Sequence, residues 1–329
     1  MKVLFRTAAG PTIGLGHLSR SASLAHAIRE ILPDADLVMC ANSPARGTPP
    51  SIPTSWILLE EFNRHDIDVI SREDPDIVIV DTYLAPPDYL ETLGEKCLLV
   101  QFDDGTGGSR QVTAHVLVNG NLHARSLGYR KVNPHTRLLL GPKYLVMRPE
   151  YWDACSLPDS DPGIMVTTGG SDLHNLLPKF LEALSPTPFD VTAVIGPYFT
   201  REQAAAAKDA AGSRAPPGTL SLISNAESLL PYIARSSLAI TACGTTVYEI
   251  LRLQRKPVIF EIAENQLPLA EALRKQGVPD LGWWEDLDWD CMGDTIQSCM
   301  EGAPAPGRLW RAIDGQGARR VAGILADMV

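Results

Sequence analysis

A histidine between glycines and a helix start is the feature that points most directly to chemistry. His17 lies in Ile13–Arg20, shortly after the apolar strand candidate Lys2–Phe5, where a segment of helical periodicity begins. Gly14 and Gly16 allow a sharp turn and a close approach of the backbone to a ligand. The positive end of the helix dipole disfavours a charged imidazole, so we expect a neutral ring that can accept a proton. The pattern predicts a general base, although a tight turn with a backbone-bonded histidine would look the same.

Polar side chains follow two further apolar segments, at the point where each expected strand ends. Asp81 and Tyr83 follow the first, and Asp103 and Asp104 follow the second. Because the carboxyl ends of parallel strands share one edge of a sheet, we expect these residues to open toward the same side as His17. Tyr83 could hydrogen-bond to or stack on a sugar, whereas the aspartates could equally be turn-forming caps.

Two glycine loops in the second half follow strand candidates and lead into helices, a pattern typical of anion binding at helix N-termini. Glu249 lies one helical turn after the second loop and could accept hydrogen bonds from ribose hydroxyls. The alternative is that the polar residues, with Asp172, are ordinary helix caps. Asn265 and Gln266 follow another strand and offer amide groups to hydroxyls or a diphosphate. The loop residues are Gly169, Gly170 and Ser171, then Gly244, Thr245 and Thr246.

Short apolar segments alternate with helical ones in both halves of the chain, which predicts an α/β protein with parallel sheets buried on both faces. The polar stretch Asp159–Pro162 reads as a linker. We therefore expect two doubly wound domains facing across a cleft: residues 1–158 and 163–308, followed by one helix over 309–329 that packs back on the first. Expected strands are Lys2–Phe5, Asp36–Cys40, Trp56–Leu59, Ile77–Val80, Leu98–Phe102, Val116–Val118, Leu138–Leu140, Gly163–Thr167, Val191–Ile195, Leu220–Ile223, Leu238–Thr241 and Val258–Ile262.

Composition excludes several classes of protein. The chain of 329 residues has a net charge of −10 and no basic run, so we expect no nucleic-acid partner. The six cysteines form no Cys-x-x-Cys pair, and neither a signal peptide nor a long apolar segment is evident, so a soluble cytoplasmic protein with no membrane partner is expected. The glycine segments fit neither a Rossmann dehydrogenase nor a Walker loop. We expect no metal, no cofactor and a monomer.

Taken together, the motifs resemble a known family, the UDP-sugar hydrolases of pseudaminic acid biosynthesis (UDP-2,4-diacetamido-2,4,6-trideoxy-β-L-altropyranose hydrolases), which are related to MurG-type glycosyltransferases. The resemblance runs in order over nearly the whole chain. It implies a GT-B fold of two Rossmann-like domains, a UDP-sugar substrate, and metal-independent hydrolysis at the anomeric carbon with inversion. His17 matches the catalytic histidine, and Tyr83, Glu249 and Asn265 match positions of the active site. The motifs that carry the resemblance contain Arg6, Gly14, Gly16, His17, Arg20, Asp81, Tyr83, Asp103, Gly169, Gly170, Ser171, Gly244, Thr245, Thr246, Glu249, Asn265 and Gln266.

One position departs from the family pattern. The first loop of the family reads Arg-x-Asp, whereas this chain has Arg6-Thr7-Ala8. If the missing carboxylate orients the histidine or the sugar, the substrate or the reaction differs. Two alternatives to hydrolysis therefore stay open, an inverting GT-B glycosyltransferase with a UDP-sugar donor and a nucleotide-sugar binding protein without turnover.

Overall fold

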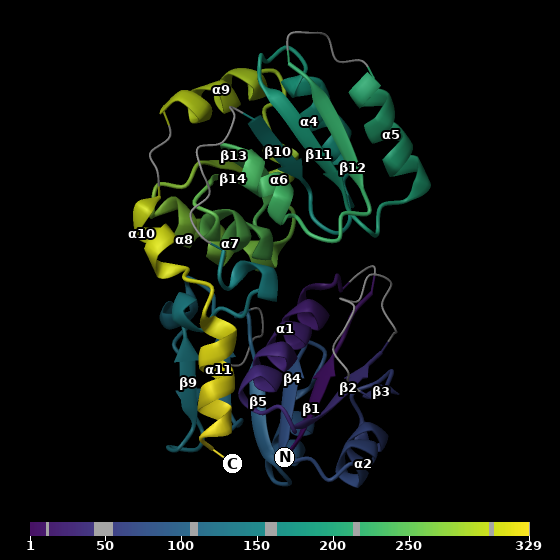
Figure 1. The fold of residues 1–329 in the computed structure, drawn as a ribbon, viewed down its shortest axis with the longest axis vertical. Coiled ribbons are helices and arrows are strands. Elements are labelled where there is room, and N and C mark those ends of the chain that lie inside the picture. The colour runs from purple at the N-terminus through teal and green to yellow at the C-terminus, as the bar shows by residue number, and fades with distance from the viewer. Residues whose placement is uncertain are drawn as a thin grey trace. The chain divides into compact units, whose positions relative to one another are not determined.

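The chain forms two α/β units in a computed structural model, each built around an all-parallel sheet (Figure 1). The structure describes residues 1–10, 13–42, 55–105, 111–154, 163–212, 218–302 and 306–328. Unit 1 contains Met1–Trp152 and Asp314–Val329, and unit 2 contains Asp153–Ile313. The expected linker Asp159–Pro162 lies outside the described residues. No helix in the described ranges combines the length and the apolar character needed to cross a bilayer.

Unit 1 has a seven-stranded parallel sheet in the order β3-β2-β1-β4-β5-β7-β9. Its strands are near-continuous Val, Ile and Leu runs, as expected for a sheet covered on both faces. A two-stranded sheet of β6 and β8 accompanies it. The strands are β1 (Lys2–Thr7), β2 (Asp36–Ala41), β3 (Ser55–Leu58), β4 (Ile77–Asp81), β5 (Leu98–Phe102), β6 (Gln111–Val112), β7 (Val116–Asn119), β8 (Arg130–Lys131) and β9 (Arg137–Leu140), and the α-helices are α1 (Gly16–Ile31), α2 (Arg64–Arg72), α3 (Pro87–Gly94) and α11 (Gly317–Ala326).

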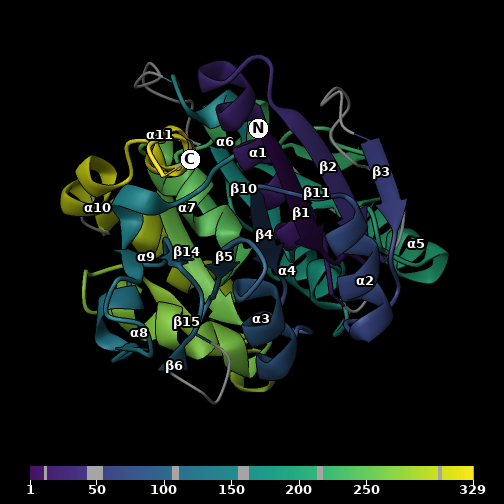
Figure 2. The same ribbon diagram turned by 90° about the horizontal axis from the view of Figure 1, so that it is seen from below.

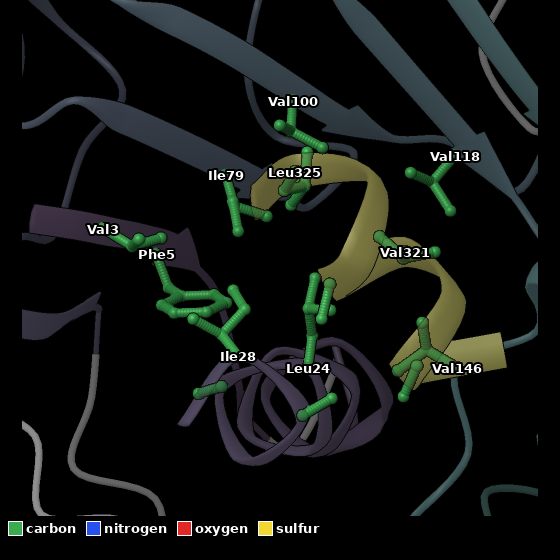
Figure 3. Close-up of a cluster of buried hydrophobic side chains, with 14 of the residues drawn as sticks. Val3, Phe5, Leu24, Ile28, Ile79, Val100, Val118, Val146, Val321 and Leu325 are labelled. Carbon is green, nitrogen blue, oxygen red and sulfur yellow. The ribbon is translucent and has the colours of Figure 1, made fainter. Parts of the chain in front are cut away.

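Helices α1 and α11 cover one face of this sheet, and α2 and α3 cover the other (Figure 2). On the first face, Phe5 and Ile79 from the strands meet Leu24 of α1 and Leu325 of α11 (Figure 3). On the second face, Leu4 packs in a cluster with side chains of α2 and α3. Successive strand residues point to opposite faces, so the parity of a residue decides which helices it meets. This rule fixes the positions of the polar residues at the strand ends.

Unit 2 repeats the design with a six-stranded parallel sheet in the order β12-β11-β10-β13-β14-β15. One face packs its apolar side chains on α4, α5 and α9. The strands are β10 (Gly163–Thr167), β11 (Asp190–Ile195), β12 (Leu220–Ser224), β13 (Leu238–Ala242), β14 (Lys256–Glu261) and β15 (Asp280–Trp283), and the helices are α4 (Leu176–Leu184), α5 (Arg201–Gly212), α6 (Leu230–Arg235), α7 (Thr245–Arg252), α8 (Leu267–Arg274), α9 (Met292–Gly302) and α10 (Gly307–Ala312).

The C-terminal segment differs from the single helix expected over 309–329. It forms two helices, α10 in unit 2 and α11 in unit 1. The break falls at Ile313, whose φ of −105° and ψ of 81° leave the helical region, and at Gly315, whose φ of 77° is left-handed. Helix α11 then packs along α1, with Val321 and Leu325 in the same buried cluster as Leu24.

Candidate active site

In both sheets the direction of strand succession reverses at one point, between β1 and β4 in unit 1 and between β10 and β13 in unit 2. Ligands of open parallel sheets bind beyond the carboxyl ends of the strands at such a switch point. His17, in the first turn of α1, follows β1, and Asp81 is the last residue of β4. The two side chains meet at the switch point of unit 1.

His17 is held by a buried carboxylate. Its Nδ1 lies 2.7 Å from Oδ1 of Asp81, and the side chains are 4% and 0% exposed. Burial opposes ionisation of Asp81, but Arg20 and His17 outweigh it and lower the pKa of Asp81. The carboxylate can only accept, so Nδ1 carries the proton and donates it. In the neutral ring Nε2 then keeps its lone pair, and this atom has no hydrogen-bond partner within the described ranges.

Arg20, one turn along α1, fixes the carboxylate that holds His17. Its Nε donates to Oδ2 of Asp81 at 2.8 Å and its Nη2 to Oδ1 at 2.6 Å. The same guanidinium donates from Nη1 and Nη2 to the two oxygens of Asp104, at 2.7 and 3.0 Å. Burial works against the charge of Arg20, but both carboxylates together raise the pKa of Arg20 well above its usual value. Arg20 therefore binds two carboxylates of the protein itself and is a permanent cation between them.

Tyr83 stands over the histidine. The two rings meet edge to face with centroids 4.2 Å apart, and Tyr83 is 50% exposed. Partial burial and the nearby Asp104 raise the pKa of Tyr83 to about 12, so its hydroxyl stays protonated and can donate a hydrogen bond. An exposed aromatic ring beside a basic nitrogen suits the apolar face of a sugar.

The glycines before His17 form a tight turn with free space around it. Gly10 and Gly14 bond to each other through their backbones, and Gly14 has a φ of 83° that favours glycine. Neither Gly14 nor Gly16 would bring a Cβ within 4 Å of another described atom. As far as the described residues go, the backbone beside His17 is thus open for a ligand to approach.

Arg6, which is predicted from the sequence to bind substrate, lies outside this cluster. It is fully buried, its Nε donates to Oδ2 of Asp66 at 2.8 Å, and its guanidinium lies 3.9 Å from the centroid of the Phe62 ring. Arg6 has the strand parity of Leu4 and therefore points to the face covered by α2 and α3. Arg6 therefore pairs with Asp66 in the interior of unit 1.

Asp103, also predicted to bind substrate, has its carboxylate bonded elsewhere in unit 1. Its Oδ1 accepts from the backbone N–H of Gly105, and its Oδ2 accepts from the Tyr129 hydroxyl at 2.6 Å. The neighbouring Asp104 belongs to the His17 cluster through its pair with Arg20, and it also accepts from Nδ2 of Asn121 at 3.1 Å. The sequence alone carries a signal for Asp104, because it continues the alternation of Phe102, which packs on the α1 side of the sheet.

At the switch point of unit 2, the first glycine loop follows β10. Gly169 adopts a φ of 102°, and a Cβ on Gly196 would lie 2.3 Å from the Gly169 carbonyl oxygen, so the loop packs backbone to backbone. Gly170 is exposed and Ser171 half-buried. Asp172 accepts from the N–H groups of Leu176 and Leu177 in the first turn of α4, the kind of hydrogen bond that the capping alternative predicted, while the N-cap position is Asn175.

The second loop of unit 2 opens α7. Gly244 is its N-cap and has no side chain to satisfy the first N–H groups of the helix. Thr245 is exposed and Thr246 half-buried, so hydroxyls stand beside those N–H groups. Glu249 lies four residues after Thr245, on the same helix face. This arrangement suits a diphosphate with a neighbouring hydroxyl-bearing ring.

The two amide residues after β14, Asn265 and Gln266, have different surroundings. Gln266 accepts a hydrogen bond at Oε1 from the Ile262 N–H at 2.9 Å, so its oxygen supports the loop. Asn265 is exposed within the short 3-10 helix Glu264–Gln266. Of the predicted residues, the structure thus brings together His17, Arg20, Asp81 and Tyr83, while those of unit 2 line the ends of its own strands.

Solved structures of known proteins share the architecture of this chain. MurG of Acinetobacter baumannii superimposes with a TM-score of 0.68 at 14% identity, over 99% of this chain and all of that one. The spinosyn rhamnosyltransferase SpnG gives a TM-score of 0.69 at 14% identity, over 99% and 100%. The chain has a GT-B fold. The UDP-GlcNAc 2-epimerase of Neisseria meningitidis, solved with UDP-GlcNAc, shares it with a TM-score of 0.60 at 12% identity, over 99% and 100%.

Sequence comparison is less informative than this likeness of GT-B folds. No family model matches the chain. A curated relative, the uncharacterized protein MJ1062 of Methanocaldococcus jannaschii, is 25% identical over 278 residues. That match covers 81% of this chain and 56% of the relative, so the chain spans little more than half of its length.

Proposed function

We propose that this chain hydrolyses a UDP-linked acetamido-deoxy sugar at the anomeric carbon with inversion. The products are UDP and a free sugar, which would serve nonulosonic acid synthesis of the pseudaminic type. The observation that carries the proposal is His17, which pairs through Nδ1 with the buried Asp81 carboxylate while its Nε2 has no hydrogen-bond partner among the described residues. A histidine held in this tautomer is the usual general base of enzymes.

In the proposed reaction, Nε2 of His17 takes a proton from a water molecule while the water oxygen attacks the anomeric carbon. The bond from that carbon to the diphosphate oxygen breaks, and UDP leaves with the electron pair. Attack from the face opposite the leaving group gives the inverted anomer. Asp81 stabilises the imidazolium that forms, and general base catalysis of this kind contributes roughly 100- to 10,000-fold.

UDP is assigned to unit 2. The N–H groups of the α7 start, with the Thr245 and Thr246 hydroxyls, are suited to the diphosphate, and Glu249 to the ribose. Donors aimed at the diphosphate would also stabilise the charge that develops as it leaves. The assignment is supported by the fold, which this chain shares with an epimerase solved with UDP-GlcNAc.

Ala8 motivates the alternatives, since the resembling family has a carboxylate there. Ala8 is fully buried. The carboxylate that orients His17 is Asp81, so the orientation of the base does not depend on an acid at position 8. This favours hydrolysis over a protein that binds without turnover. An inverting glycosyltransferase would use the same base on an acceptor hydroxyl.

The test is to incubate the purified chain with the UDP-diacetamido sugar and to follow UDP and free sugar together. We expect both in equal amounts without an added acceptor, and no loss of rate in EDTA. UDP release only when an acceptor is added would replace hydrolysis with glycosyl transfer. Tight binding without release would leave a binding protein.

A further inference from the structure

Asp104 lies at the far side of the Arg20 guanidinium from Asp81, and nothing in the hydrolysis scheme uses it. It is held firmly, by Arg20 at 2.7 and 3.0 Å and by Nδ2 of Asn121 at 3.1 Å. Arg20 alone would neutralise Asp81. Because Arg20 and Asp81 already balance each other, the carboxylate of Asp104 makes the net charge of the cluster negative.

Within the described ranges, the charged side chains that pair with His17 or with its partners come from three elements, and the titratable His123 places its Nε2 3.4 Å from the Asp104 backbone oxygen. Arg20 is on α1, Asp81 and Tyr83 are at and after the end of β4, and Asp104 follows β5. The side chains of Arg20 and Asp104 are 15% and 24% exposed, so solvent screens them only in part. Tyr83 is neutral. Among the described residues of this cluster, one guanidinium and two carboxylates leave a net charge of minus one beside the imidazole.

We propose that Asp104 is a positioning residue that acts through Arg20 to set the charge felt by His17. With Asp104 present, proton uptake by His17 takes the cluster from minus one to neutral. Without it, the same proton takes the cluster from neutral to plus one, which is unfavourable in a largely buried place. Asp104 also holds the second edge of Arg20, so the guanidinium is aligned to fix both oxygens of Asp81.

This inference rests on the proposed function only for His17 as the base. Its test therefore uses two readouts, the titration of the His17 ring by NMR and the pH profile of UDP release. In Asp104→Asn we expect the ring to titrate at a pH lower by roughly half a unit to one unit. The acid limb of kcat/KM should move in the same direction, kcat should fall about tenfold, and KM should change little. Asp104→Glu should retain most of the wild-type midpoint.

Asp66→Asn is the matched control, because it removes the carboxylate of another buried Arg–Asp pair without touching the cluster. It should lower stability and leave the His17 midpoint in place. Asp104→Ser removes the same carboxylate with a smaller side chain and should lower the midpoint in the same way, which keeps the test open if Asp104→Asn does not fold. An unchanged midpoint in Asp104→Asn or in Asp104→Ser, or an equal shift in Asp66→Asn, would overturn the inference. If the wild type released no UDP, the proposed function would fail while the NMR titration still decided the role of Asp104.

Discussion

The ring of Tyr83 meets the imidazole of His17 edge to face, with centroids 4.2 Å apart and ring planes at 73°. The Nε2 atom of that imidazole is buried, although half of Tyr83 itself is exposed. The tyrosine is thus placed as a cover that a sugar would have to displace or stack against.

Replacing this cover should expose the base and weaken sugar binding. In Tyr83→Ala we expect His17 to react severalfold faster with diethyl pyrocarbonate, measured by mass spectrometry, and KM to rise about tenfold, the effect of losing one aromatic contact. Leu84→Ala is the control, since Leu84 is equally exposed next to it and has no ring contact with His17. Equal reactivity in Tyr83→Ala and the wild type would show that another group covers Nε2.

The Asp81 carboxylate should be essential for the tautomer of His17. In Asp81→Asn the amide can donate to Nδ1, which would put the proton on Nε2 and abolish the base. We expect kcat to fall about 10,000-fold, as in other enzymes with this pairing. Stability should fall by about 1–3 kcal/mol, because Arg20 and His17 lose a charged hydrogen-bond acceptor while Arg20 keeps Asp104. Steady-state kinetics and urea unfolding measure the two effects, and a variant that keeps a tenth of the activity would remove Asp81 from the mechanism.

Arg6 should matter for folding and not for substrate. Arg6→Met leaves Asp66 as a buried carboxylate without its cation, so the free energy of unfolding should fall by about 3–5 kcal/mol. At a temperature where the variant is folded, KM should equal that of the wild type. A large rise in KM with unchanged stability would restore the substrate role that the sequence pattern suggested.

Glu261 in unit 2 should make stability depend on pH near neutrality. Burial and the neighbouring Asp280 carboxylate raise the pKa of Glu261 to about 7, from an ordinary 4.5. The folded state therefore binds a proton more tightly than the unfolded state, and stability should fall as pH rises from about 4.5 to 7 and then level off. Thermal unfolding of Glu261→Gln should lack this slope, whereas the exposed Glu264→Gln should keep it. A wild type whose stability rises over that window would contradict the assignment.

The fold class was predictable from sequence and is confirmed, because continuous apolar strands alternating with helices leave few alternatives. The alternation of strand side chains between the two faces of the sheet distinguishes Asp81 from Arg6. Asp81 continues the pattern of Ile77 and Ile79 and lies on the α1 face, whereas Arg6 continues that of Leu4 and lies on the opposite face. This alternation is visible in the sequence and predicts that Asp81, and not Arg6, lies near His17.

Other features of the site needed the three-dimensional structure. The choice between Asp103 and Asp104 depends on the turn after β5, where Tyr129 captures Asp103 from 26 residues away. The pairing of Arg20 with both Asp81 and Asp104 depends on distances between three separate elements. The break at Ile313 also needed the structure, because the residues on both sides of it have helical periodicity.

Hydrolysis in H₂¹⁸O tests the proposed chemistry at the bond it breaks. Products are separated after a single turnover and weighed by mass spectrometry, and the first anomer formed is read by ¹H NMR. If His17 directs water to the anomeric carbon, ¹⁸O appears in the free sugar, UDP stays unlabelled, and the anomer is inverted. Label in UDP, or a sugar formed with retained configuration, would contradict that mechanism.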